Sequence, residues 1–368
     1  MSKIIQNFKN ISYGPAPEDS KDVMSWINSL KNPNHLFING TWAKSKSSKK
    51  LDVINPATNK KLTSLSISNK ADVNAAVGAA KKAYNIWSKT SSDTRAKYLY
   101  ALARLIQKHS RFLSVLETID NGKPIRETRD IDIPLVARHF YYHAGWAKKI
   151  CTEIHKPIGV VGQIIPWNFP LLMLAWKIAP AIAAGNTVVL KPAEFTSLTA
   201  LYFAELCQKA RIPKGVINII TGDGGTGEYI TSHPDTKKIA FTGSTEVGKK
   251  IIQTTSVQEK KLTMELGGKS PFVVFEDADL DSAVEGVVDA IWFNQGQVCC
   301  AGSRLLVQES IEKLFIKKLK SRMEKLRVGN PLDKSIDIGA IVAPVQLKKI
   351  QSIVKKGEKE GSKLWQPS

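Results

Sequence analysis

The feature that most constrains the fold is a run of short apolar segments, alternating with helical segments, between residues 158 and 242. Four of them have the length and apolar content of buried strands: Val160 to Ile165, Thr187 to Leu190, Val216 to Ile220 and Ile239 to Thr242. Helices are predicted between them, over Leu171 to Ala184, Ser197 to Ala210 and Gly225 to Ser232. Near-continuous apolar strands separated by helices are typical of a parallel sheet covered on both faces. The middle of the chain is therefore predicted to be a doubly wound α/β domain, in which ligands bind at the carboxyl ends of the strands.

The residues before this domain are predicted to be mainly helical. Asn69 is a candidate N-cap with Asp72 three residues later, and apolar residues recur at helical spacing as far as Trp87. A second helix is expected over residues 93–120 with Gly122 as its stop, and a third over residues 133–150. Further upstream we expect a turn-rich stretch over 13–17, a short helix over 23–30 and a hairpin around Asn39-Gly40.

Composition limits the class of protein and its compartment. With 368 residues the chain is long for a single hydrophobic core, which favours two domains. Its four cysteines, Cys151, Cys207, Cys299 and Cys300, lack the spacing of a disulfide framework or a zinc site. A reducing compartment is expected. The N-terminus lacks a signal-peptide pattern and has no arginine before Arg95, which favours a cytoplasmic location.

Charge and hydropathy argue against nucleic acid and membranes as partners. The net charge of +20 raises nucleic acid as an interpretation, but the lysines are spread along the chain with no arginine-rich block. The most apolar segment, Ile158 to Gly185, is interrupted by Pro166, Pro170 and Pro180, so we expect it to be buried and not membrane-spanning. A solvated, lysine-rich surface is the favoured interpretation of the charge.

The best candidate for covalent chemistry is the stretch from Phe293 to Arg304, FNQGQVCCAGSR. Cys299 lies there among small and polar residues, whereas buried structural cysteines usually lie in apolar runs. A catalytic cysteine reacts as the thiolate, so it needs a partly exposed setting with donors or a base nearby. From these residues alone, packing of a vicinal cysteine pair is the competing interpretation.

Three segments at strand ends could hold a dinucleotide. Residues 222–227, GDGGTG, satisfy G-x-G-x-x-G after a predicted strand, and residues 241–248, FTGSTEVG, open a helix with free backbone N–H groups. A tight turn explains either pattern equally well, and the residues themselves do not choose. Lys191 and Glu194 also follow a strand, where they could hold a ribose or form a surface ion pair. Glu194 would repel a 2′-phosphate, which favours NAD over NADP.

Five motifs, in this order, make the chain resemble the aldehyde dehydrogenase superfamily from about Leu36 to the C-terminus. They are PWNFP from Pro166, KPAE from Lys191, FTGSTEVG from Phe241, ELGGKSP from Glu265 and the cysteine stretch. The start, YGPAPE from Tyr13, and the short connector from Lys148 to Pro157 look most like the family 16 branch. The resemblance implies an N-terminal extension at 1–35, a Rossmann-type doubly wound dinucleotide-binding domain at 36–266 and a second α/β, catalytic domain at 267–368.

The resemblance also implies roles for individual residues. Cys299 matches the family's nucleophile, Asn168 the side-chain donor of the oxyanion hole and Glu265 the general base, with Cys300 a bystander. In isolation, Glu265 would equally suit a strand-end carboxylate paired with Lys269. No metal is expected. Cofactor contacts are implied at Ile164, Ile165, Trp167, Lys191, Glu194, Gly243, Ser244, Thr245, Glu246, Val247 and Gly248. The pattern at residues 222–227 would then be a decoy.

Two departures from the family pattern affect what we expect of the oligomeric state and of the catalytic domain. Only residues 148–157 fill the place of a longer hairpin that helps to build the family's tetramers, which argues against a tetramer and leaves a homodimer open. The sequence stops at Ser368 without the family's later Glu-Ile-Phe-Gly-Pro segment, so we expect a C-terminally incomplete catalytic domain. Strands such as 272–275 and 304–308 would then expose unpaired edges.

The predicted function is NAD-dependent oxidation of a small-molecule aldehyde to a carboxylic acid, through a thiohemiacetal and a thioester on Cys299. No particular aldehyde is predicted. The alternative is a catalytically impaired fragment or pseudoenzyme that acts as a binding or scaffold module. The joint presence of Cys299, Glu265 and Asn168 argues against that alternative.

Overall fold

The computed structural model describes residue 6 and residues 18–30, 36–150 and 154–367. The turn-rich stretch expected at residues 13–17 and Cys151 lie outside the described residues. The expected short helix is present as α2 (Lys21–Ser29), and the expected hairpin as β1 (Leu36–Ile38) and β2 (Thr41–Ala43). At its turn, Asn39 and Gly40 both have positive φ, as a two-residue primed turn requires.

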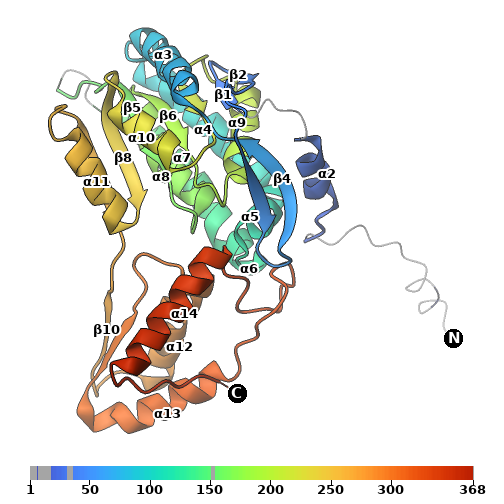
Figure 1. Cartoon of the computed structure of the whole chain (residues 1–368), viewed down its shortest axis with the longest axis vertical. Coiled ribbons are helices and arrows are strands. Elements are labelled where there is room, and N and C mark those ends of the chain that lie inside the picture. Colours follow the sequence, from blue (N-terminus) through green and yellow to red (C-terminus); the bar gives the residue numbers. More distant parts are fainter. Residues whose placement is uncertain (1–5, 7–17, 31–35, 151–153, 368) are drawn as a thin grey trace.

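A seven-stranded sheet forms the centre of the molecule (Figure 1), in the order β2-β1-β7-β6-β5-β8-β9. Its five parallel strands are β5 (Val160–Ile164), β6 (Thr187–Lys191), β7 (Ile217–Ile219), β8 (Thr236–Gly243) and β9 (Lys261–Leu266). The chain runs outward from β5 to β7 and then returns across β5 to β8 and β9. The strand order therefore reverses between β5 and β8, which is the position where doubly wound sheets bind ligands. The predicted doubly wound α/β fold is confirmed.

Helices cover both faces of this sheet. On one face lie α8 (Pro170–Ala183) and α9 (Leu198–Lys209), and on the other α3 (Lys70–Trp87), α10 (Gly224–Ser232) and α11 (Thr245–Thr255). Asn69 caps α3 through a reciprocal pair of hydrogen bonds with Asp72, as predicted. Buried apolar side chains form a separate cluster on each face, so each helical layer has its own core.

A second helical layer packs against α8 and α9. It consists of α4 (Ser92–Lys108), α5 (Ser110–Asn121) and α7 (Ile133–Lys149), which are linked by the short helix α6 (Ile125–Glu127) and the π-helical turn η1 (Thr128–Asp132). The prediction of one helix over residues 93–120 is wrong, because the helix breaks at His109, whose ring nitrogen lies 2.8 Å from the hydroxyl of Tyr202 on α9. The stop at Gly122 is confirmed, with φ of 91°.

A small lobe follows β9 and lies below the sheet domain in Figure 1, where it is drawn in orange and red. Its strands β10 (Pro271–Val274) and β11 (Arg304–Val307) pair in parallel only with each other among the described residues, as the exposed-edge prediction requires. Its helical elements are α12 (Leu280–Trp292), η2 (Phe293–Gly296), η3 (Glu309–Ile311), α13 (Glu312–Met323) and α14 (Pro344–Lys359). The division of the chain into domains after residue 266 stays a prediction.

Two further observations complete the fold. An antiparallel hairpin of β3 (Lys50–Asn55) and β4 (Lys60–Ser66), which we did not predict, packs beside α2 and α5. Its strands are rich in lysine and show no strict apolar alternation, which explains why the sequence does not reveal it. Within the described ranges, no helix has the length and apolar character needed to cross a membrane.

Candidate active site at the carboxyl end of the sheet

A cleft of about 620 Å³ opens at the carboxyl ends of β5, β6 and β8, where the strand order reverses. Its walls come from these strand ends, from the segment that follows β5, and from α10 and α11. Eight of the predicted cofactor residues line it: Ile164, Ile165, Trp167, Lys191, Glu194, Gly243, Ser244 and Val247. The structure thus brings together residues that are up to 83 positions apart, between Ile164 and Val247.

Three predicted cofactor residues do not line the cleft. Thr245 and Glu246 form the first turn of α11, beside Ser244, whose side chain accepts a hydrogen bond from the backbone N–H of Val247. Gly248 faces β9, because a Cβ atom on it would lie 2.6 Å from Cδ2 of Leu266. Its small size is therefore explained by the packing of α11 on β9.

The competing glycine pattern lies on the same cleft. Gly224 and Gly227, from the start of α10, line the wall opposite α11. Gly222 lies in the tight turn before α10, where a Cβ atom would lie 2.0 Å from the hydroxyl oxygen of Thr226. The two glycine patterns therefore lie at the same cleft. The sequence alone presents them as alternative binding sites in two different places.

Lys191 and Glu194 form a pair at the rim of this cleft. The Nζ atom of Lys191 lies 3.7 Å from Glu194 Oε2 and donates to the carbonyl oxygens of Pro192 and Gly222, at 2.9 Å each. Lys191 is buried, and burial lowers the pKa of its ammonium, an effect that Glu194 opposes. Thr242 lines both this cleft and a second cavity beneath α8, and its hydroxyl is buried. The polar group that the rim offers to a ligand is the carboxylate of Glu194.

The cysteine stretch follows α12 as an irregular turn. Asn294 and Gln295 have left-handed backbone conformations, with φ of 47° and 55°, and Cys299 and Cys300 that follow are exposed. Burial of its sulfur raises the pKa of the Cys299 thiol, and the adjacent Cys300 raises it further. Hydrogen bonds from the backbone N–H groups of the two cysteines lower the pKa of the Cys299 thiol. The thiol therefore needs a base or a donor to become a thiolate near neutral pH.

Asn168 lies directly beside the cysteine stretch. Its side-chain Nδ2 donates to the backbone oxygen of Gln297 at 2.8 Å, and its own backbone oxygen accepts from Asn294 Nδ2 at 2.7 Å. A side-chain amide has two N–H donors, so one of them is not used in this bond. The amide of Asn168 therefore contacts the backbone two residues before Cys299, as a shared site would require.

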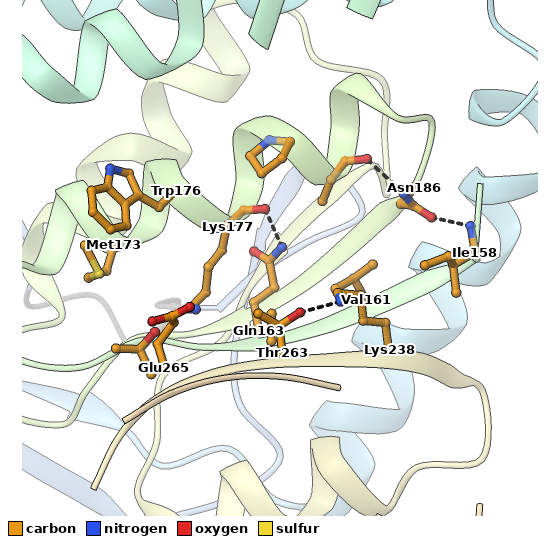
Figure 2. A pocket seen from close by; sticks show the side chains of 14 residues that line it. Ile158, Val161, Gln163, Met173, Trp176, Lys177, Asn186, Lys238, Thr263 and Glu265 are labelled. Carbon is orange, nitrogen blue, oxygen red and sulfur yellow. Dashed lines mark hydrogen bonds between the residues drawn. The ribbon is translucent and has the colours of Figure 1, made fainter. Parts of the chain in front are cut away.

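Glu265 lies at the carboxyl end of β9 and lines a second cavity, of about 360 Å³, beneath α8 (Figure 2). In this view Lys177 extends from α8 toward the Glu265 carboxylate. Burial lowers the pKa of Lys177 to about 8, and Glu265 acts against that shift. The expected alternative, pairing with Lys269, is not among the described ion pairs, since Lys269 Nζ donates to the Gly268 oxygen at 2.9 Å.

The loop after Glu265 touches the cysteine stretch. A Cβ atom on Gly268 would lie 3.4 Å from the backbone oxygen of Cys299, so the ELGG segment and the cysteines are in contact. Cys299, Asn168 and the loop that follows Glu265 therefore meet in one region. Asn294 and Gln297 lie within the cysteine stretch that the sequence singles out, but sequence reasoning gave no role to Glu127, whose carboxylate contacts Asn294, or to Lys177, which extends toward Glu265. Lys177 is visible in the sequence as a lysine within an apolar run, whereas Glu127 has no comparable sign.

Within the described ranges there is no cluster of three or more histidine, cysteine or acidic side chains suited to a metal ion.

Comparison with known proteins identifies close relatives. The model of the aldehyde dehydrogenase family matches residues 42–368. The putative aldehyde dehydrogenase DhaS of Bacillus subtilis (strain 168) is 46% identical over 349 residues, which cover 91% of this chain and 70% of that protein. The mitochondrial aldehyde dehydrogenase of Rattus norvegicus is 44% identical over 367 residues, which cover 95% of this chain and 69% of that protein.

Solved structures agree. The NAD+ complex of an aldehyde dehydrogenase from Bacillus cereus superposes with a TM-score of 0.89 at 38% identity, over 96% of this chain and 73% of that one. The chain thus spans about 70% of the length of these relatives. The assignment to the family 16 branch stays a prediction.

Proposed function

The chain belongs to the aldehyde dehydrogenase family, and from that premise we propose that it oxidises an aldehyde to a carboxylic acid through a covalent intermediate on Cys299. NAD is the proposed hydride acceptor, and the related structure from Bacillus cereus is an NAD+ complex. The observation that carries the proposal is the 2.8 Å bond from Asn168 to Gln297, which brings a side-chain amide donor next to an exposed cysteine.

The cleft at the strand ends suits NAD. It is formed at the reversal of strand order, and the carboxylate of Glu194 lies at its rim. In the proposal, Glu194 and Lys191 hold the adenosine ribose, the N-terminus of α11 at Ser244 holds the pyrophosphate, and Ile165 and Trp167 form the wall. When bound, NAD supplies an acceptor for the hydride that leaves the substrate carbon.

The proposed reaction begins with attack by the Cys299 sulfur on the aldehyde carbon. A C–S bond forms, and the carbonyl oxygen gains the negative charge. The free N–H of Asn168 and the backbone N–H of Cys299 would hold this oxyanion, and one such donor is worth about 3–4 kcal/mol in the transition state. The carbonyl re-forms as hydride leaves, which gives a thioester on Cys299.

Glu265 is the proposed general base. It would take a proton from water, whose oxygen attacks the thioester carbon and expels the Cys299 thiolate with release of the carboxylic acid. The same carboxylate would speed ionisation of the thiol, whose pKa is raised, although the backbone N–H groups at the sulfur favour the thiolate without it. The ammonium of Lys177, directed at Glu265, would help to orient the carboxylate.

The test is NADH fluorescence after the purified chain is mixed with NAD and a panel of aliphatic and aromatic aldehydes. Cys299→Ala is the inactive variant and Cys300→Ala its matched control, since both residues are exposed neighbours. The proposal expects an NADH signal that Cys299→Ala abolishes and Cys300→Ala retains. No signal from the parent chain with any aldehyde would contradict the proposal and favour the binding or scaffold role.

A further inference from the structure

The turn before Cys299 has a backbone conformation that needs external support. Asn294 and Gln295 are consecutive non-glycine residues with φ of 47° and 55°, in the left-handed region that side chains disfavour. Such conformations persist where surrounding contacts hold them, and they concentrate at functional sites. The question is therefore which contacts hold this turn.

Part of the support comes from side chains near the turn itself. Asn294 Nδ2 donates to the backbone oxygen of Asn168, and Gln295 Nε2 donates to that of Ala340 at 2.9 Å. Gln297 accepts the backbone N–H of Val342 at 3.2 Å through its side-chain oxygen. These contacts hold side chains, but they leave the backbone N–H of Asn294 to be satisfied elsewhere.

That N–H has a charged partner from a distant part of the sequence. The backbone N–H of Asn294 donates to Oε2 of Glu127, at 2.9 Å and across 167 residues. Asn294 is fully buried and Glu127 is only 5% exposed, so water does not substitute freely for this bond. Glu127 is the last residue of the short helix α6, and the adjacent Arg126 pairs with Asp337 at 2.9 Å.

We infer that Glu127 is a positioning residue for the nucleophile: its carboxylate holds the backbone N–H of Asn294 and thereby fixes the turn that presents Gln297 and Cys299. The inference rests on the proposed function, in which Cys299 reacts with substrate. Glu127 itself acts through Asn294. A fixed turn keeps the backbone N–H groups of Cys299 and Cys300 at the sulfur, where they favour the thiolate.

The surroundings of Glu127 make its charge sensitive to pH. The pKa of its carboxyl is raised to about 7, chiefly by burial and also by Asp132, while Lys123, the Asn294 N–H and Arg126 act in the opposite direction. The bond to Asn294 is therefore charge-assisted above neutral pH and neutral below it, when a hydrogen bond of this kind has about half the strength.

Other charged groups surround the cavity of about 250 Å³ that borders Glu127. They are Asp130 on η1, Asp289 on α12, Arg322 on α13 and Asp337 in the loop that follows α13. Arg322 is paired with Glu285 at 2.6 Å and Asp337 with Arg126, so these charges are largely committed to other partners.

The first test measures the bond directly by hydrogen exchange of the Asn294 amide at pH 8. Glu127→Gln keeps an oxygen acceptor and removes the charge, Glu127→Ala removes both, and Asp130→Asn changes an exposed carboxylate at the same cavity. We expect exchange to accelerate at least about fivefold in Glu127→Ala, by a smaller factor in Glu127→Gln, whose neutral acceptor forms a weaker bond, and to stay within about twofold of the parent in Asp130→Asn. Unchanged exchange in Glu127→Ala would overturn the inference.

The second test is the rate of alkylation of Cys299 by iodoacetamide between pH 5.5 and 9, in a Cys300→Ser background, with the modified peptide identified by mass. Below about pH 7, Glu127 takes up its proton. In that range we expect the alkylation rate of the parent chain to fall more steeply than the loss of thiolate by itself would produce. Glu127→Gln should lose that extra fall, and Asp130→Asn should keep it. Glu127→Ala should be about fivefold slower at pH 8.

An extra fall that persists in Glu127→Gln, or that vanishes in Asp130→Asn, would refute the positioning role. Neither measurement uses NAD or aldehyde. Failure of the proposed function would appear instead as normal, Glu127-dependent alkylation of Cys299 in a chain that forms no NADH.

Discussion

Replacement of Lys123 by methionine should destabilise the fold strongly and in a pH-dependent manner. Lys123 is fully buried and forms an ion pair with the equally buried Asp132 at 2.6 Å, and its ammonium lies 3.9 Å from the centre of the Phe169 ring. It also favours the ionised forms of two further buried carboxyls, Glu117 and Glu127. One cation therefore faces three buried carboxyl groups and contacts Phe169, the residue directly after Asn168 of the candidate site.

The magnitude follows from the cost of an unpaired buried charge. Removal of one partner from a buried ion pair costs about 3–5 kcal/mol. This loss should be largest at pH 8, where ionised carboxyls would have lost their counterion. It should shrink by about 1 kcal/mol or more at pH 5.5. Burial raises the pKa of Glu117 to about 8 and that of Glu127 to about 7, so both are already protonated in the folded protein at pH 5.5.

The sign of the pH effect in the parent protein follows from the same shifts. The pKa values of Glu117 and Glu127 are higher in the folded state than the ordinary 4.5. Their contribution to stability is therefore complete below about pH 4.5 and is lost as the pH rises toward 7 and 8. Lys123→Met raises these folded-state pKa values further, which is why its own cost grows with pH.

The assay is urea unfolding followed by tryptophan fluorescence at pH 5.5 and pH 8. The double variant Lys123→Met/Asp132→Leu should recover most of the loss, because it removes both charges of the pair. Lys97→Met, at the exposed pair with Asp93, should leave the unfolding midpoint unchanged. A loss for Lys123→Met below about 1 kcal/mol, or equal at the two pH values, would refute this reasoning.

Three further predictions concern the site and its cleft. Cys300→Ser should lower the pKa of the Cys299 thiol and accelerate its alkylation at pH 7.5, because Cys300 contributes to the raised value; a slower reaction would be inconsistent with that cause. Gly248→Ala should cost about 1–3 kcal/mol in thermal unfolding and weaken NAD binding, because its Cβ would lie 2.6 Å from Leu266 Cδ2; an unchanged melting temperature would contradict this packing role. Glu194→Ser should raise the affinity for NADP relative to NAD by about tenfold in fluorescence titrations, since a carboxylate that repels the 2′-phosphate is removed; an unchanged ratio would remove Glu194 from the ribose site.

Much of the sheet domain was predictable because its information is local. The strands β5 and β6 are nearly continuous apolar runs and fully buried, as is typical of parallel strands covered on both faces. The capping box at Asn69 and the glycine stop at residue 122 also lie within a few residues of the helix ends that they define. The break at His109 was not predictable in this way, because it accompanies a contact with Tyr202 on another helix.

The supports of the candidate site were hidden for the same reason. Cys299, Asn168 and Glu265 lie in distinctive motifs, so the resemblance pointed to them. Glu127 and Asn294 are joined by one hydrogen bond across 167 residues, and the left-handed conformation of Asn294 has no glycine to indicate it. The two glycine patterns lie side by side because of the order of the strands in the sheet, and that order cannot be read from the sequence.

The most direct test of the account is the mass of the Cys299 peptide in a Glu265→Gln variant mixed with NAD and a reactive aldehyde. Without the proposed base, hydrolysis of the thioester should be slow, so the acyl group should accumulate on Cys299 and should be absent when NAD is omitted. An acyl group on Cys300, or no adduct in a variant that still binds NAD, would contradict the claim that Cys299 is the nucleophile.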